Sequence, residues 1–273
     1  MKIIISPAKK MNEEEDLLEV RGLPVLLDRT QILLDYMRGL DRGQAKALWK
    51  CNDAIADLNY SRIQKMDLRA RLSPAVIAYE GIQYQYMAPK IMGSGELDYI
   101  EEHLRILSGF YGILRPFDGV RPYRLEMQAG VLLEAGGKTF KSLYAFWGDS
   151  LYRELTAKDR VIVNLASKEY SRGAEPFLEP DVRFVNVVFG SLARDAGGRE
   201  KIKVKATEAK MARGEMVRFL AENRAGDPEA MKAFDRLGFV YSEKYSGEDE
   251  FVFLRQTERN IEENEAGGSL RKI

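Results

Sequence analysis

The sequence predicts a mixed α/β protein of the α+β class that contains a helical hairpin. Three observations favour this class. Segments with strand-like and helix-like periodicity are mixed along the whole chain, antiparallel hairpins are expected near its end, and neither a linker nor an internal repeat divides it. We therefore expect a single domain over residues 1–257, followed by a polar C-terminal tail over residues 258–273.

The first elements follow from local patterns. Residues 2–5 (KIII) are mostly β-branched and apolar, and Ser6-Pro7 stops them, which predicts a short buried strand that opens into a loop. Residues 24–40 and 44–58 carry apolar side chains at helical spacing, and glycines bound the turn between them. These segments predict a helical hairpin inserted at about residues 24–58.

The remaining elements continue the mixture of strands and helices. The glycines and prolines between residues 108 and 127 exclude a long helix there. Further helices are expected at residues 97–107, 142–155, 207–223 and 228–237. Further strands are expected at residues 75–79, 160–165, 182–189, 201–205, 239–245 and 250–254.

Composition narrows the classes of function. Lys+Arg and Asp+Glu number 42 each, so a surface that binds anions has to be a local one. One cysteine, Cys51, and one histidine, His103, exclude a disulfide framework and argue against a transition-metal site, so we expect neither metal nor cofactor. We find no run of about 18 apolar residues and no signal peptide, which predicts a cytoplasmic protein without a membrane partner.

The segment ISPAKKM, residues 5–11, is the first candidate for chemistry. A strand that ends in Ser6 places a hydroxyl, and then Lys9 and Lys10, at the edge of a sheet where ligands often bind. Lysine ammonium groups suit phosphate as point charges. The alternative is a surface turn with two solvated lysines, and no glycine-rich nucleotide motif is present to decide between them.

The segment from His103 to Met127 concentrates arginine and aromatic rings. Guanidinium groups bind phosphates with two parallel hydrogen bonds, and aromatic rings stack on bases. The alternative is that these arginines are tied to Asp118, Glu126 and backbone carbonyls and fix a long loop. The arginines concerned are Arg105, Arg115, Arg121 and Arg124.

Two helical segments could add to such a surface. Lys210 and Arg213 lie at helical spacing in residues 205–224, although glutamates between them could instead form a salt-bridged, solvated helix. Arg42 and Lys46 begin the second helix of the expected hairpin, where free backbone amides suit a phosphate. Most hairpins of two helices, however, simply pack against a core.

Several blocks of the sequence resemble the YaaA peroxide stress protein family (DUF328/UPF0246). They are ISPAK, HLRILSGFYGILRPFDGVRPYRLEM, LYAFWGD, VIVNLASKEY and KMARGEMVRFLAENR, within a resemblance from residue 1 to about 256. The resemblance implies a cytoplasmic protein with a family-specific fold, built on a central mixed sheet with flanking helices. It also implies protection from hydrogen peroxide by limiting free iron and DNA damage.

The resemblance further implies binding of double-stranded DNA through a positively charged cleft with an element like a helix-hairpin-helix. In this chain that element would be residues 33–58. Its turn, GLDRG, separates the two glycines by three residues, whereas the usual motif separates them by one.

Two hypotheses of function follow. In the first, the protein binds double-stranded or branched DNA without reading its sequence and limits damage by iron and peroxide. The phosphate contacts would be Lys9, Lys10, Arg42, Lys46, Arg105, Arg115, Arg121, Arg124, Lys210 and Arg213. In the second, the protein is an enzyme that acts on a nucleotide-like small molecule, a nucleobase or a DNA sugar-phosphate. Its pocket would lie near Ser6, Lys9, Tyr79, Glu80, Asn164 and Ser167.

Overall fold

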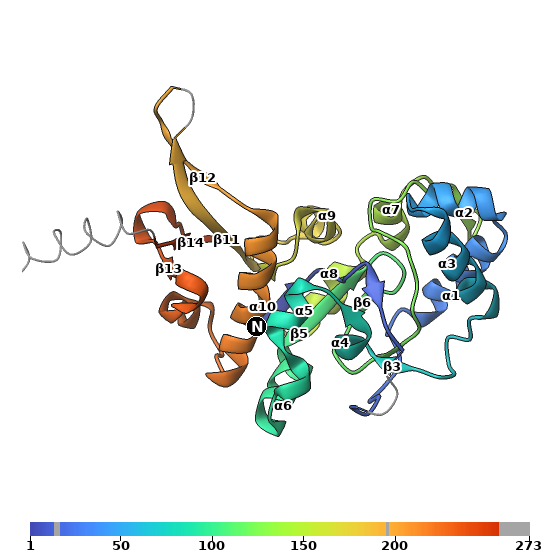
Figure 1. The fold of residues 1–273 in the computed structure, drawn as a ribbon, viewed down its shortest axis with the longest axis horizontal. Helices are drawn as coiled ribbons and strands as arrows, with labels where there is room; N and C mark the ends of the chain where they lie inside the picture. Colours follow the sequence, from blue (N-terminus) through green and yellow to red (C-terminus); the bar gives the residue numbers. More distant parts are fainter. Residues whose placement is uncertain (14–16, 195–196, 257–273) are drawn as a thin grey trace, which may run out of the picture.

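The computed structural model describes residues 1–13, 17–194 and 197–256 of the chain. It confirms the mixed α/β class, because an eight-stranded sheet of parallel and antiparallel strands is flanked by helices (Figure 1). The expected tail over residues 258–273 lies outside the described residues. The strands of the sheet, in spatial order, are β13 (Phe239–Tyr241), β14 (Glu250–Arg255), β11 (Arg183–Arg194), β10 (Val161–Leu165), β1 (Lys2–Ile5), β5 (Leu104–Ser108) and β6 (Gly112–Leu114), and β12 (Glu200–Lys203) pairs with β11.

Strand β1 lies in the middle of the sheet and is confirmed as a buried strand. All four of its residues are buried, and it pairs in parallel with β5 on one side and with β10 on the other. Strands β11 and β14 continue the parallel part, while β6 and β13 add antiparallel edges. A parallel strand covered on both faces has a continuous apolar run, which is what KIII supplies.

The order of the strands reverses beside β1. The chain runs from β1 to β5 on one side and later returns to place β10 on the other side, with β11 and β14 farther out. In open parallel sheets, ligands bind in the crevice beyond the carboxyl ends of the strands at such a reversal. Ser6 follows β1 directly, and Ser167 follows β10, so both stand at this crevice.

Helices gather around the sheet and at one end of the molecule. Helices α1 to α3 lie together at one end, and the ribbon of β11 and β12 projects at the other (Figure 1). The α-helices are α1 (Leu27–Arg38), α2 (Arg42–Trp49), α3 (Asp53–Lys65), α4 (Ala75–Ala78), α5 (Ile82–Met87), α6 (Ser94–His103), α7 (Leu143–Trp147), α8 (Ser150–Thr156), α9 (Lys168–Ser171) and α10 (Ala206–Glu222).

Small elements complete the fold. They are the pairs β2 (Lys10–Met11) with β4 (Tyr79–Glu80), β3 (Ser73–Pro74) with β7 (Gly119–Val120) and β8 (Leu133–Ala135) with β9 (Lys138–Phe140), and the 3₁₀ helices η1 (Pro89–Ile91), η2 (Glu175–Phe177), η3 (Pro228–Ala233), η4 (Arg236–Gly238) and η5 (Glu243–Tyr245).

Helix α10 packs closely on α5 because it carries a glycine at the contact. A Cβ atom at Gly214 would lie 2.1 Å from the carbonyl oxygen of Gln83 and 3.0 Å from the backbone nitrogen of Met87. Only a glycine permits the two backbones to come this near. The contact fixes Arg213, the neighbour of Gly214, close to the start of α5.

The prediction of a single helix over residues 44–58 is wrong. The chain forms two helices there, α2 and α3, because Lys50 adopts a left-handed conformation (φ 45°) that ends α2. The side chain of Asn52 then accepts a hydrogen bond from the backbone N–H of Ile55 (2.9 Å) and caps α3. The expected hairpin is therefore a group of three helices that extends to Lys65.

Two further expectations fail where an apolar run suits either kind of element. Residues 75–78 form the short helix α4 instead of a strand, and their first amides bond to carbonyls of the loop that ends at Asp118. The helix expected to reach residue 107 ends at His103, because residues 104–108 are fully buried and pair with β1 as strand β5. Periodicity alone does not separate a short buried strand from a buried helix.

Glycine and short turns also shorten some expected elements. Gly148 (φ 53°) divides the helix expected at 142–155 into α7 and α8. The strand expected at 239–245 ends at Tyr241. The helix expected at 228–237 consists of 3₁₀ turns.

Candidate active site beyond the ends of β1 and β10

A pair of serines joins the ends of the two central strands. The hydroxyl of Ser6 accepts a hydrogen bond from the backbone N–H of Ser167 (2.8 Å) and donates one to the hydroxyl of Ser167 (3.2 Å). The hydroxyl of Tyr84, on α5, donates to the carbonyl of Ser6 (3.0 Å). Ser6 is thereby fixed, and the hydroxyl proton of Ser167 has no acceptor in the described part of the chain.

A pocket of about 410 Å³ lies against this pair. The loop after β1, the start of α5, the loop after β10 and helix α10 form its walls. Its cationic lining residues are Lys9, Lys10, Lys210 and Arg213, and its carboxylates are Glu80, Glu126 and Glu169. The volume lies within the range of about 300–1,000 Å³ that small-molecule sites occupy.

Two buried donors in the wall of the pocket have no acceptor. Gln83 is only 6% exposed, and its Nε2 makes no hydrogen bond within the described residues. Arg213 is partly buried, its Nε is likewise unsatisfied, and no carboxylate in the described ranges pairs with it. Burial lowers the pKa of the Arg213 guanidinium. Buried donors without partners are uncommon in proteins, and here both belong to residues that line the pocket.

The other cations of the pocket differ in how they are neutralised. Lys9 pairs with Glu126 (2.8 Å), and Lys10 pairs with Glu80 (2.8 Å). Lys210 is exposed and forms no ion pair with any residue that the structure describes. Lys210 and Arg213 therefore leave a positive charge on the α10 side of the pocket.

Glu169 is the carboxylate best suited to exchange a proton. It lies in α9, two residues after Ser167, and burial raises its pKa, while a hydrogen bond from the backbone N–H of Gln128 (3.3 Å) opposes that rise. Glu126, close enough to raise the pKa of Glu169 further, accepts from Lys9 and Arg124. A carboxyl group whose pKa is raised by burial is suited to act as a general acid.

The five catalytic candidates do not all reach the pocket. Ser6, Lys9 and Ser167 line it, whereas Tyr79 and Asn164 do not. The hydroxyl of Tyr79 bonds to that of Tyr123 (2.8 Å), which bonds to Ser108 (2.6 Å), in a fully buried chain. Asn164 is buried and bonds to Asn186 (2.8 Å), so it connects β10 to β11.

The arginines of the segment from residue 103 to 127 are bound to internal acceptors. Arg105 is buried and donates to the carbonyls of Glu101 and Leu104. The others pair with carboxylates, Arg115 with Asp118 (3.0 Å), Arg121 with Glu13 (3.1 Å) and Arg124 with Glu126 (3.3 Å). His103 bonds to the carbonyl of Met1 (2.9 Å) and lies against Tyr99.

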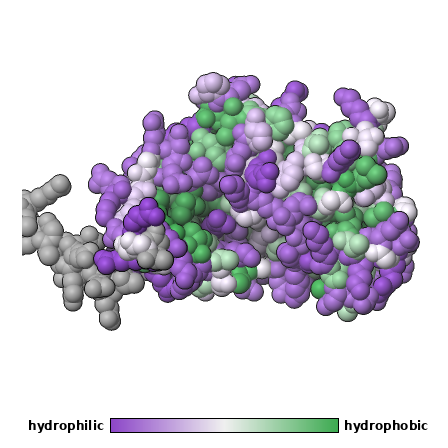
Figure 2. Space-filling model, turned by 90° about the horizontal axis from the view of Figure 1, so that it is seen from above, coloured by the Kyte–Doolittle hydropathy of each residue, from purple (hydrophilic) through white to green (hydrophobic). Residues whose placement is uncertain are grey.

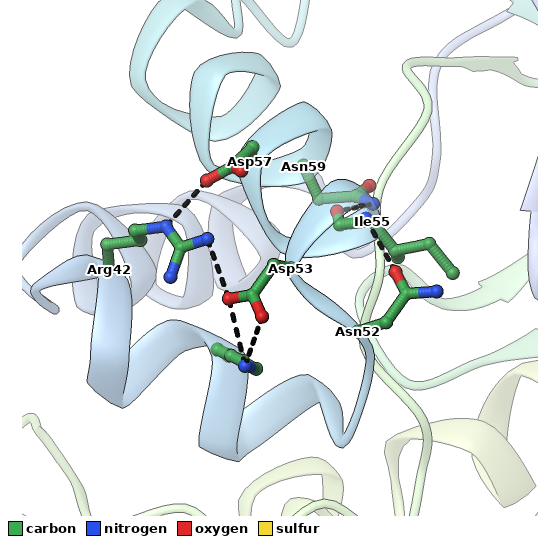
Figure 3. A network of polar contacts seen from close by, with 7 residues as sticks. Arg42, Asn52, Asp53, Ile55, Asp57 and Asn59 are labelled. Carbon is green, nitrogen blue, oxygen red and sulfur yellow. Dashed lines mark hydrogen bonds and ion pairs between the residues drawn. The ribbon is translucent and has the colours of Figure 1, made fainter.

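Arg42 and Lys46 are paired within the three-helix group (Figure 3). Arg42 bonds to Asp57 (2.5 Å) and Asp53 (2.8 Å), and Lys46 bonds to Asp53 (2.8 Å). Hydrogen bonds from Lys46 and Arg42 lower the pKa of Asp53. The carboxylate of Asp41 accepts the backbone N–H of Gln44 (2.8 Å), so an anion of the protein itself caps α2 where a phosphate would bind.

The predicted phosphate contacts thus divide among several places. The structure brings Lys9, Lys10, Lys210 and Arg213 together at one pocket, whereas the other predicted cations do not line it and bond to carboxylates or backbone carbonyls of the protein. Sequence reasoning missed Gln83, Glu126 and Glu169 as lining residues. Only Glu169 could have been found from the sequence, because it falls in the segment that directly follows the strand expected at residues 160–165.

Other features bear on the type of site. No group of three or more His, Cys, Asp or Glu residues suited to a metal ion occurs among the described residues. Within the same ranges no helix has the length and apolar character needed to cross a membrane. Hydrophilic side chains cover much of the face in Figure 2, and hydrophobic ones appear in separate groups without a continuous band.

Comparisons with known proteins agree on the family. A family model described as peroxide stress protein YaaA matches residues 1–245. A UPF0246 protein of Agathobacter rectalis is 49% identical over 256 residues, which cover 94% of this chain and 99% of that protein. A UPF0246 protein of Lachnoclostridium phytofermentans is 51% identical over 255 residues, 93% of this chain and 96% of that protein. The chain therefore belongs to the YaaA family of peroxide stress proteins, the UPF0246 proteins.

Proposed function

We propose that this protein serves the response to peroxide stress as an enzyme that acts on a nucleotide unit held in the pocket beyond β1 and β10. The observation that carries the proposal is the pair of unsatisfied donors, Gln83 Nε2 and Arg213 Nε, in the wall of that pocket. Acceptor oxygens of a phosphate or a base would satisfy both donors. Lys210 supplies a further positive charge for the phosphate.

The chemistry would be acid–base catalysis beside the phosphate. Glu169, with its raised pKa, would hold a proton that it could donate to an oxygen of the ligand, while Glu126 pairs with Lys9 beside it. The Ser167 hydroxyl, whose proton has no acceptor in the part of the chain that the structure describes, would donate a hydrogen bond to the ligand. Bound iron has no part in this proposal, so an effect on iron would be indirect, through protection or repair of DNA.

Adenosine monophosphate provides a direct test. We expect it to bind the wild-type protein and the affinity to fall about tenfold or more in Arg213→Met, because the variant loses charge-assisted hydrogen bonds in a partly buried site. Isothermal titration calorimetry at low salt measures this change. Arg218→Gln is the matched control, because it removes the same charge from the same helix. Arg218 pairs with Glu222 outside the pocket.

Failure of the pocket hypothesis has a clear form. Equal losses in Arg213→Met and Arg218→Gln would show that binding follows overall charge and not this pocket. Screening several nucleotides and nucleobases for binding to both variants would show which base the pocket prefers.

Double-stranded or branched DNA is the second candidate ligand. Its support is that Lys9, Lys10, Lys210 and Arg213 converge on one pocket, into which an extruded nucleotide could enter while the duplex stays outside. Duplex affinity should then fall with rising salt, with a logarithmic slope of about −0.9 for each phosphate neutralised. Duplex binding that is insensitive to salt, or that Arg213→Met leaves unchanged, would reject this candidate.

A further inference from the structure

A second cavity, of about 450 Å³, lies beside the end of α3. We call it the α3 cavity. Its walls come from α3, from residues 67–71 and from Arg121. Four cationic side chains line it, together with one carboxylate, that of Asp67. The cations are Arg62, Lys65, Arg71 and Arg121.

Three of the four cations of the α3 cavity form no ion pair with a carboxylate that the structure describes. The side chains of Arg62, Lys65 and Arg71 form no ion pair or hydrogen bond with any residue that the structure describes. Arg121 is held by Glu13 (3.1 Å) and by the carbonyl of Arg71 (2.5 Å). On the neighbouring helix α2, by contrast, Arg42 is fully paired with aspartates.

Stabilisation of the C-terminal end of α3 accounts for only part of this charge. Lys65 and Arg62 lie in the last turn, where cations favourably meet the negative end of the helix dipole. That end corresponds to about half an elementary charge. Arg71 and Arg121 come from other segments, so the fold brings four cations together without needing them for the helix.

Two residues that line the α3 cavity, Arg71 and Arg62, are in energetically unfavourable states. Arg71 adopts a left-handed backbone conformation (φ 53°), which is uncommon for a residue other than glycine. Arg62 is partly buried, and burial and then the charge of Arg121 lower its pKa, although Glu13 opposes this. Strained backbone and crowded like charges gather at binding sites, where a ligand compensates for them.

We propose that the α3 cavity is a second anion site, which takes a ligand carrying two or more linked phosphate groups. Guanidinium groups bind phosphate oxygens with paired hydrogen bonds, and those of Arg62 and Arg71 donate none to the residues that the structure describes. The cavity is larger than a single phosphate needs, and its cations outnumber the carboxylates Asp67 and Glu13. The inference is independent of the nucleotide pocket, because the two cavities share no lining residue.

Inorganic pyrophosphate is the probe for the test. We expect calorimetry to detect its binding to the full chain, and the affinity to fall about tenfold or more in the double variant Arg62→Ala/Lys65→Ala. The control Arg69→Ala/Lys141→Ala removes the same charge from exposed residues outside both cavities and should change the affinity less than about twofold. Arg62→Lys keeps the charge but loses the forked donor, so its affinity for pyrophosphate should lie between those of the wild type and the double variant.

The outcomes separate the two sites. Loss of pyrophosphate binding in Arg62→Ala/Lys65→Ala together with retained binding in Arg213→Met supports the α3 cavity. Loss in Arg213→Met alone would place the anion in the pocket beyond β1 and β10 and overturn the inference. Equal loss in the control variant, or no binding by the wild type at millimolar pyrophosphate, would overturn it as well. An unchanged thermal midpoint without ligand confirms that each variant is folded.

Discussion

At the scale of single residues, the most informative groups are those whose donors have no acceptor. Gln83 is almost completely buried, and its amide nitrogen has no hydrogen-bond acceptor among the described residues. Arg213 keeps a charged donor in the same wall although carboxylates are abundant in the chain. Both unpaired donors belong to residues that line one pocket, and phosphate is an acceptor that suits an arginine well.

Glu169 gives a prediction about pH. Burial raises the pKa of Glu169 in the folded protein above the ordinary value of 4.5. Between pH 4.5 and that raised pKa, the folded protein therefore binds more protons than the unfolded chain. The contribution of Glu169 to stability is therefore complete below about pH 4.5 and is lost as pH rises through the raised pKa. Glu169→Gln, which stays neutral, should unfold at a higher temperature than wild type at pH 8 and at the same temperature near pH 4.

The control for this prediction is Glu134→Gln, which removes the same charge from an exposed residue of β8. Its thermal midpoint, followed by circular dichroism, should track that of the wild type across the pH range. If Glu169→Gln were less stable than wild type at pH 8, the ionised carboxylate would be stabilising and the assignment of Glu169 as a proton donor would lose its basis.

At the scale of elements, Gly214 determines how α10 meets α5. A methyl group there would lie 2.1 Å from the carbonyl oxygen of Gln83, so the helices have to separate in Gly214→Ala. We expect a loss of about 2 kcal/mol or more in the free energy of unfolding, measured with urea, because the contact is part of the core. Weaker nucleotide binding should accompany it, since Arg213 and Gln83 move apart.

Gly226 provides the comparison. A Cβ atom there would meet nothing within 4 Å, and its φ is not in the left-handed region. Gly226→Ala should leave both stability and nucleotide binding close to wild type. A small effect of Gly214→Ala, similar to that of Gly226→Ala, would mean that α10 can shift freely and that the walls of the pocket are not fixed by this contact.

The elements also show what the sequence could and could not predict. The apolar run KIII predicted β1, and the spacing of apolar residues predicted α10, because each element is decided by local pattern. Strand β5 was missed, since its residues also suit a helix and only pairing with β1, far away in the sequence, decides the outcome. The break at Lys50 was missed because a left-handed lysine has no clear sequence signal.

The same reasoning explains the outcome for the site. Ser6, Lys9 and Ser167 could be predicted as lining residues, because they follow expected strands and strand ends meet at one edge of a sheet. The partners of the arginines could not be predicted. Whether Arg121 meets Glu13 or a phosphate depends on tertiary packing that local sequence does not record.

At the scale of the whole molecule, the mixed sheet has a buried parallel centre formed by β5, β1, β10, β11 and β14. The loops after β1 and β10 carry the serine pair and one wall of the pocket proposed to hold a nucleotide, and helix α10 contributes Lys210 and Arg213 to that pocket. The α3 cavity is lined in part by α3. This helix belongs to the three-helix group at one end of the molecule (Figure 1). Two anion sites on separate structural units could bind two ligands, or two parts of one extended ligand, without sharing residues.

This organisation predicts a gradient of local stability that amide hydrogen exchange can measure. Strand β1 is buried and paired on both sides, so its amides should exchange only when the whole protein unfolds. Strands β5 and β10 pair with β1 and should share that limit. The isolated hairpin of β8 and β9, whose turn is Gly136-Gly137, should exchange by local opening and therefore much faster.

Measuring amide exchange at increasing urea concentrations distinguishes exchange by global unfolding from exchange by local opening. Exchange in β1, β5 and β10 should quicken with the same steep dependence as global unfolding, while exchange in β8 and β9 should barely respond. If β10 opened well before β1, the sheet would not unfold as one unit. Ser6 and Ser167 would then be joined only part of the time, and a pocket built across the ends of the two strands would not be a stable site.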